Sequence, residues 1–262
     1  MNNNKFDKFF YSVDNSSEHF LSEIENLSDE EYMQSYNGKM FCPRCKGPQL
    51  SLVNRSDSSF LRTYPKQPHI LIDGKLCPYA FKTASKTTME KYVKELRDKK
   101  KIKSTLEAIM RRLMDLHIPK PTVPRTTDGT SNDPLLIEKE QKDKTIKRSV
   151  IPHFSFKTWG KNIPQDQLLV VYGKVHIDLK DTEYQDRDGN TRTLTFIQFR
   201  DIPTNKFITS CIKPQEMNIS PGNYYAAVLG CCSVNESQGH TYYNLSVNFP
   251  DTESILLKPF SP

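Results

Sequence analysis

The chain has 262 residues, of which 36% are hydrophobic and 26% charged, and its formal net charge is +6. This apolar content excludes general disorder. No apolar run approaches the length of a membrane-spanning helix, which argues against a membrane partner. The length suits one large domain or two modest ones, and we expect two.

Charge is distributed unevenly along the chain. Residues 1–36 hold eight acids against two lysines, whereas residues 82–103 hold nine bases against three acids. The first residues lack the apolar core of a signal peptide, so we expect a cytoplasmic protein. In a reducing compartment, clustered cysteines more often hold a metal than form disulfides.

The first third of the chain predicts one helix followed by a segment of short strands and turns. Residues 16–36 have apolar side chains at roughly helical spacing, and Ser28 with Glu31 matches a capping box. Residues 39–82 lack this periodicity and are rich in Pro, Ser and Gly. Such a segment needs a cross-link to stay ordered.

Four residues of this segment, Cys42, Cys45, His69 and Cys77, are candidate metal ligands. Two thiolates separated by two residues can both reach one ion. His69 and Cys77 follow at a looser spacing and complete a tetrahedral set. Three sulfurs and one imidazole predict a structural Zn²⁺, because four protein ligands leave no open position for water. The alternative is that the cysteines are free thiols and His69 is a surface histidine.

The motif F-C-P-R-C at residues 41–45, followed by a strand and a downstream histidine, resembles the zinc ribbon at the start of CoiA-like competence proteins. The resemblance covers about residues 39–81 and implies a DNA-linked setting. The histidine-flanked pattern of that family is missing here, and no nuclease portion can be matched.

Residues 86–117 predict two helices or one bent helix, with apolar residues three or four apart on either side of Lys99, Lys100 and Lys101. Ser104 with Glu107 matches a second capping box, which favours two helices. The three lysines are candidate phosphate contacts, although a solvated helix face would look the same. Prolines and turn residues in 118–148 predict an extended linker.

Beyond the linker the apolar period changes to two, first in residues 170–180 and then in four further strand-like runs. The predicted fold is therefore α+β: an N-terminal zinc-bound module with helices (residues 1–117), a linker (118–148) and a C-terminal all-β, OB-like barrel (149–262). The strand order resembles OB-fold proteins that bind single-stranded DNA, over about residues 167–250. The matching residues are Gly173, Lys174, Val175, Val228, Gly230, Gly239, Tyr243, Leu245 and Val247.

One face of the first two strands of this barrel combines cations with aromatic rings. Proteins that bind single strands use cations to follow phosphates and aromatic rings to stack bases. The candidate contacts on this face are Tyr172, Lys174, His176, Arg192, Phe196 and Arg200. The alternative is that Phe196 packs inside the barrel and the others form an ordinary solvated face.

No nucleotide-binding glycine loop, nucleophile elbow or metalloprotease histidine pair occurs in the sequence, so we do not expect an enzyme. The sequence predicts a nucleic-acid-binding accessory protein for single-stranded DNA or RNA. The alternative is an adaptor that docks on protein partners in a phage, plasmid or defence assembly. A metal-dependent nuclease is the third possibility.

Overall fold

The computed structural model describes nearly all of the chain. The described residues are 6–55, 58–64, 67–114, 116, 133–141, 143–160, 162–237, 239–247 and 252–261. They divide into two compact units, which we call the first unit (Met1–Ser85 with Ser131–Asn162) and the second unit (Lys86–Thr130 with Ile163–Pro262). Within the described ranges, no helix has both the length and the apolarity needed to cross a membrane.

This division differs from the predicted domains 1–117, 118–148 and 149–262. The basic helices belong to the second unit, together with the large sheet. Residues 136–140 and 146–148 of the predicted linker lie in the β6–β7 hairpin of the first unit. Residues 118–132 and 142 of the predicted linker lie outside the described residues. The order of elements along the chain does not show which apolar faces will pack together. The sequence therefore did not predict that the basic helices join the second unit and that part of the linker joins the first.

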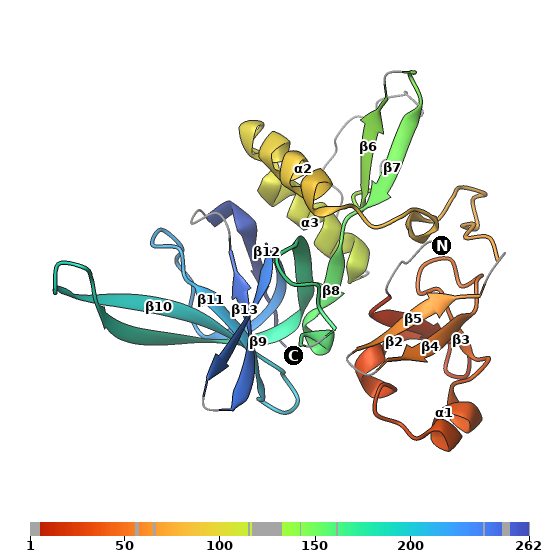
Figure 1. Cartoon of the computed structure of the whole chain (residues 1–262), viewed down its shortest axis with the longest axis horizontal. Coiled ribbons are helices and arrows are strands. Elements are labelled where there is room, and N and C mark those ends of the chain that lie inside the picture. Colours follow the sequence, from red (N-terminus) through yellow and green to blue (C-terminus); the bar gives the residue numbers. More distant parts are fainter. Residues whose placement is uncertain are drawn as a thin grey trace. The chain divides into compact units, whose positions relative to one another are not determined.

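The first unit consists of short strands and single helical turns around a small core (Figure 1). Its elements are β1 (Lys8–Tyr11), β2 (Ser16–Phe20), η1 (Leu21–Glu23), α1 (Asp29–Ser35), β3 (Met40–Phe41), β4 (Leu50–Asn54), β5 (Ser59–Thr63), η2 (Pro78–Ala80), β6 (Leu136–Glu140), β7 (Ile146–Val150), β8 (His153–Ser155) and η3 (Phe156–Thr158). Strands β2, β1 and β3 form one antiparallel sheet, while β4–β5 and β6–β7 are hairpins.

The predicted helix over residues 16–36 is only partly present. Residues 16–20 form strand β2, and helix α1 covers only residues 29–35. The capping box is confirmed: the Ser28 hydroxyl accepts the Glu31 N–H at 3.3 Å, and the Glu31 carboxylate accepts the Ser28 N–H at 3.0 Å. A helical spacing in a short segment does not exclude a strand, because β1 supplies a pairing partner that local sequence does not reveal.

The second unit combines two helices with a large antiparallel sheet (Figure 1). Its elements are α2 (Lys86–Asp98), α3 (Ile102–Leu113), β9 (Leu168–Gln185), β10 (Thr191–Arg200), β11 (Phe207–Ile212), β12 (Gly222–Ser237), β13 (His240–Ser246), η4 (Thr252–Ser254) and β14 (Ile255–Pro259). The strand order is β11-β10-β9-β12-β13, and β14 also pairs with β12. Strands β9 to β13 confirm the five predicted strand runs.

Helix α3 provides the second unit with an apolar face toward the sheet. Ile102, Leu106, Ile109 and Leu113 recur at helical spacing and are buried. The helix contacts β9, β12 and β14. Two helices were predicted and are confirmed, but α3 begins at Ile102, and the Ser104 hydroxyl donates to the Lys101 carbonyl instead of capping the helix.

The sheet does not close into the predicted barrel through backbone pairing of the described strands. Its outer strands are β11 and β13, and each pairs with one neighbour only. They approach each other where the Thr209 hydroxyl donates to the Tyr243 carbonyl at 2.9 Å. The sheet therefore has two open strand edges, β11 and β13, which lie close together near Thr209 and Tyr243.

Gly230 allows β13 to approach β12 closely. A Cβ atom at this position would lie 2.6 Å from the Ser246 carbonyl oxygen. We expect Gly230→Ala to lower the free energy of unfolding of the second unit by about 1–3 kcal/mol, because the backbone must shift. Urea unfolding followed by far-UV circular dichroism measures the change. Ser233→Ala on the same strand is the control and should cost about 0.5 kcal/mol or less; equal losses in both variants would contradict the close approach.

Candidate functional site

The four predicted ligands Cys42, Cys45, His69 and Cys77 come together in the first unit. All four ligand atoms lie within 4.8 Å of one another. The sulfurs of Cys42 and Cys77 are 4.0 Å apart, and the Cys45 sulfur is 3.5 Å from His69 Nδ1. Four soft donors at these separations could hold one metal ion.

Two tight turns position these ligands. The first follows β3: the Cys42 N–H donates to the Pro48 carbonyl at 2.8 Å and the Lys46 N–H to the Cys42 carbonyl at 3.0 Å. Lys46 has φ = +54°, a left-handed conformation that reverses the chain directly after Cys45. In the second turn, the Cys77 N–H donates to the His69 carbonyl at 3.0 Å. Backbone bonds therefore hold both ligand pairs in place.

Burial and mutual hydrogen bonds shift the pKa values of the three thiols in different directions. Cys42 and Cys77 are fully buried, whereas Cys45 is partly exposed. Burial raises the pKa of Cys42, and hydrogen bonds from Cys42 and Cys77 lower the pKa of Cys45. For Cys77, the bond to Cys42 lowers the pKa, but the bond to Cys45 and burial outweigh it and raise the pKa to about 12. A divalent cation would bind all three sulfurs as thiolates.

A buried polar cluster that the sequence did not predict lies next to these ligands. The His153 Nδ1 is 2.7 Å from the Ile151 carbonyl, which can only accept, so Nδ1 carries the proton. Nε2 therefore accepts the Tyr79 hydroxyl at 2.8 Å. Burial lowers the pKa of His153 and raises that of Asp7, which accepts the Ser155 N–H. This cluster connects Asp7, the residue before β1, with η2 and β8, and no local motif marks it in the sequence.

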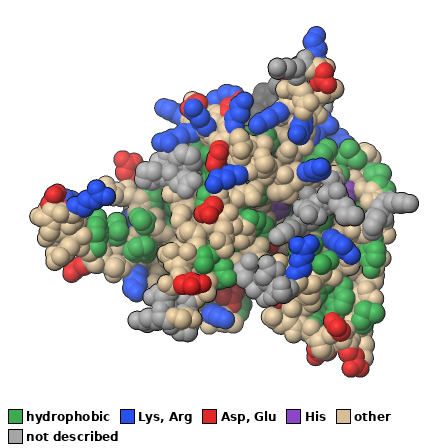
Figure 2. Space-filling view, in the orientation of Figure 1, with side chains coloured by type: hydrophobic (Ala, Val, Ile, Leu, Met, Phe, Trp, Pro, Cys, Tyr) green, Lys and Arg blue, Asp and Glu red, His purple; other side chains and the backbone are tan. Residues whose placement is uncertain are grey.

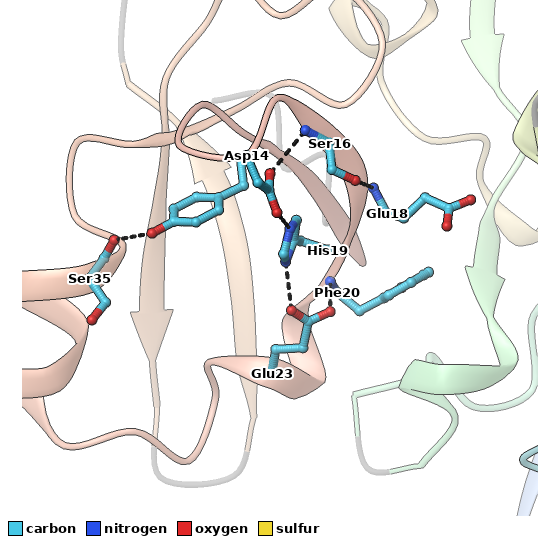
Figure 3. Close-up of polar contacts among 8 residues, drawn as sticks. Asp14, Ser16, Glu18, His19, Phe20, Glu23 and Ser35 are labelled. Carbon is cyan, nitrogen blue, oxygen red and sulfur yellow. Dashed lines mark hydrogen bonds and ion pairs between the residues drawn. The ribbon is translucent and has the colours of Figure 1, made fainter. Parts of the chain in front are cut away.

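A second unpredicted cluster surrounds His19 on β2 (Figure 3). Its Nε2 lies 2.6 Å from an Asp14 carboxylate oxygen, and its Nδ1 lies 2.7 Å from a Glu23 carboxylate oxygen. The ring stacks on Phe9, with centroids 5.5 Å apart. Both ring nitrogens face acceptors, which favours the doubly protonated imidazolium.

The lysines Lys99, Lys100 and Lys101 form the turn between α2 and α3, and all three are exposed. Lys99 makes an ion pair with Glu95 at 2.9 Å. Lys100 has φ = +53°. Figure 2 shows Lys and Arg side chains gathered over this part of the second unit. The structure thus presents these candidate contacts at the surface.

The six candidate residues on the sheet share one face, as predicted, because β9 and β10 pair in a register that places His176 opposite Arg200. Tyr172, however, is only 3% exposed, so its ring offers no surface for stacking a base. Residues 168–173 of β9 are buried throughout, and α2 and α3 both contact this strand. Alternation alone did not reveal that α2 and α3 would contact this strand or that its first half would be buried on both faces.

Acids neutralise much of the remaining positive charge on this face. Arg192 pairs with Asp186 at 2.9 Å and Arg200 with Asp178 at 2.7 Å. His176 contacts Asn223 at 2.9 Å and Asp178 at 3.4 Å. Lys174 is exposed, and Phe196 is partly buried. The sheet face therefore does not form a continuous track of cations.

The chain matches no protein-family model, no curated protein and no solved structure. The resemblances to CoiA-like proteins and to OB-fold proteins therefore stay predictions.

The His19 cluster predicts a pH-dependent stability of the first unit. Partial burial lowers the pKa of His19, but the bonds to Glu23 and Asp14 outweigh it and raise the pKa above its ordinary value of 6.5. Its stabilisation is therefore complete below pH 6.5 and is lost as pH rises through the raised pKa. His19→Gln should cost about 1 kcal/mol at pH 6 and less at pH 9, measured by urea unfolding.

The acid side of this profile has the opposite sign. The bond to His19 lowers the pKa of Asp14, so the contribution of Asp14 is lost as pH falls through that lowered value. A cost of His19→Gln that is the same at pH 6 and pH 9 would show that the ring does not act as a charged group.

Proposed function

We propose that this protein binds nucleic acid through the phosphate backbone, using the exposed cations of α2 and α3, and that a structural Zn²⁺ orders its first unit. The observation that carries the proposal is the charge of the helical hairpin. Residues 86–114 hold ten bases and four acids. Helix α3 turns its apolar face to the sheet. Eight of the ten bases are exposed, whereas Arg111 pairs with Glu107 and Arg112 is only partly exposed. A dense cationic surface attracts a polyanion and gains affinity from counterion release.

The backbone at Lys100 supports this reading. Helix α2 ends with bonds from Lys101 N–H to the Leu96 carbonyl at 2.9 Å and from Lys100 N–H to the Arg97 carbonyl at 2.9 Å. This is a C-terminal cap whose left-handed residue is usually glycine. A lysine with φ = +53° is strained there. Strain that persists in an exposed turn is consistent with a function for the side chain.

Phosphate contact at this surface does not require base stacking. The predicted stacking residue Tyr172 is buried, and Arg192 and Arg200 are paired with acids. We therefore place the main interface on the helices instead of the sheet face. Contacts of this kind read charge and not sequence, so we expect little base preference.

The cluster of Cys42, Cys45, His69 and Cys77 fits Zn²⁺ by its donors and spacing. A tetrahedron with bonds of about 2.3 Å has edges of about 3.8 Å, close to the 4.0 Å and 3.5 Å separations observed. Four protein ligands leave no position for a catalytic water. The four residues would hold the ion, and the ion would supply the cross-link between the two ligand turns.

We predict that charge reversal at the helix turn weakens binding. The variant Lys99→Glu/Lys100→Glu/Lys101→Glu should bind a fluorescein-labelled 20-nucleotide oligo-dT about tenfold or more weakly at 50 mM salt, measured by anisotropy. The slope of log affinity against log salt should also become shallower. The matched control Lys180→Glu/Arg187→Glu/Lys206→Glu makes the same change in net charge on exposed residues of the second unit. Equal losses in both variants would indicate only a nonspecific effect of net charge.

A single substitution separates affinity from stability. Lys100→Gly should relieve the left-handed strain and raise the free energy of unfolding by about 1 kcal/mol, while it weakens oligo-dT binding. A 20-base-pair duplex measured in parallel reports whether the surface prefers single strands. If neither nucleic acid binds at 50 mM salt, the proposed function is wrong.

We predict one Zn²⁺ per chain by elemental analysis. Cys42→Ser and Cys77→Ser should lose the ion and unfold the first unit, because its core includes both sulfurs. Trp159 is the single tryptophan and lies in the first unit, so its fluorescence reports this unfolding. Cys211→Ala is the matched control, a buried cysteine of the second unit that should keep the ion. A purified wild-type chain without metal, unaffected by chelation, would exclude the site.

A further inference from the structure

We propose that the second unit binds an extended peptide segment of a protein partner as an added β-strand, in the groove between the open edges of β11 and β13. The groove has a volume of about 720 Å³, within the usual range for ligand sites. It is lined by residues 210–213 of β11 and the segment after it, and by 244–247 of β13 and the segment after it. This inference concerns a surface distinct from the cationic helices.

The edge of β11 offers hydrogen-bonding groups to this groove. The Lys213 N–H donates to the Thr195 carbonyl at 2.8 Å, which makes this a hydrogen-bonded pair. In an antiparallel ladder such pairs alternate, and the register places Cys211 opposite Ile197 and Ile212 opposite Phe196. The backbone N–H and C=O groups of Ser210 and Ile212 therefore point away from β10.

The edge of β13 faces the same space. The Tyr243 carbonyl accepts the Thr209 hydroxyl across the gap, so the backbone of Tyr243 points away from β12. By the same alternation, Leu245 also points its backbone groups outward. The Thr209–Tyr243 bond marks where the edges meet, and the groove lies beyond it toward the carboxyl ends of both strands.

The strand order specifies the direction of the missing strand. The path β11-β10-β9-β12-β13 contains five strands, each antiparallel to the next. Because five is odd, β11 and β13 run parallel to each other. One further strand that runs opposite to both would complete the alternation and close the sheet. An extended peptide can supply the regular N–H and C=O groups that this closure needs, as in other cases of β-strand addition.

The lining of the groove favours a neutral peptide over a polyanion. Its apolar part includes Leu194, Phe196 and Val247, which suits apolar side chains at alternate positions of a strand. Its charged side chains are Lys213 and Glu216, whose charges cancel. A phosphate backbone would find no net positive charge here. Side chains such as Asn235 and Asn244 can donate and accept hydrogen bonds with the polar side chains of the bound peptide.

The test uses the full chain and a defined probe. The probe is an acetylated and amidated hexapeptide with valine or isoleucine at alternate positions and serine or threonine between them. We expect hydrogen exchange of the Ser210 and Ile212 amides, followed by NMR, to slow at least tenfold at saturating peptide. The same peptide with alternate backbone amides N-methylated, which cannot complete a ladder, should bind at least tenfold more weakly.

Variants at Ile212 separate the backbone from the side chain. Ile212 is 53% exposed, and proline is tolerated on an edge whose N–H faces outward. Ile212→Pro removes that N–H and should weaken peptide binding at least tenfold, whereas Ile212→Ala keeps it and should weaken binding threefold at most. If Ile212→Pro does not fold, the N-methylated peptide still tests the same hydrogen bonds on the wild-type chain.

Three outcomes overturn the inference. The first is no protection of Ser210 and Ile212 at 1 mM peptide. The second is equal binding of the N-methylated peptide, which would indicate apolar contact without strand addition. The third is protection of these amides by oligo-dT but not by peptide, which would make the groove a nucleic-acid site. Because the Lys99–Lys101 variant should bind the peptide normally, failure of this inference is distinguishable from failure of the proposed function.

Discussion

The first unit depends on the meeting of three sulfurs and one imidazole. Its core is small, and Cys42 and Cys77 are themselves part of it, packed with Phe6, Leu61 and Tyr79. A span this rich in turns buries too little apolar surface to fix itself strongly. Contacts among the four ligand side chains fix the position of the two ligand turns relative to each other. The buried Tyr79–His153 hydrogen bond connects β8 to the same core.

In the second unit the governing constraint is the apolar face of α3. Ile102, Leu106 and Ile109 are buried against the sheet, and this contact forces the charged side chains of the hairpin outward. Helices α2 and α3 also contact β9, and Tyr172 in the first half of this strand is buried. Packing of the helices against the sheet thus goes together with an exposed cationic surface on the helices and with a buried Tyr172 ring on the sheet.

The edge strands of the sheet have backbone N–H and C=O groups that are not paired within the sheet, and such edges readily pair with strands of other chains. Here the edges of β11 and β13 are in contact at Thr209 and Tyr243. Beyond this contact a groove lies between them. The cationic helices and this groove differ in charge and in hydrogen-bonding pattern. The two proposals therefore assign different ligands to two separate surfaces of this unit.

The sequence by itself determined the features that depend on near neighbours and on residue chemistry. These include the Cys42–Cys45 pair, the capping box at Ser28, the two helices around Lys100 and the five strands with their alternation. It also predicted His69 and Cys77 as ligands, because few other soft donors lie nearby. The tertiary structure alone decided which faces were covered and which distant groups met. Burial of Tyr172, the placement of α2 and α3 in the second unit, and the Tyr79–His153 bond all depend on contacts between residues far apart in the chain. Local spacing carries no information about these contacts.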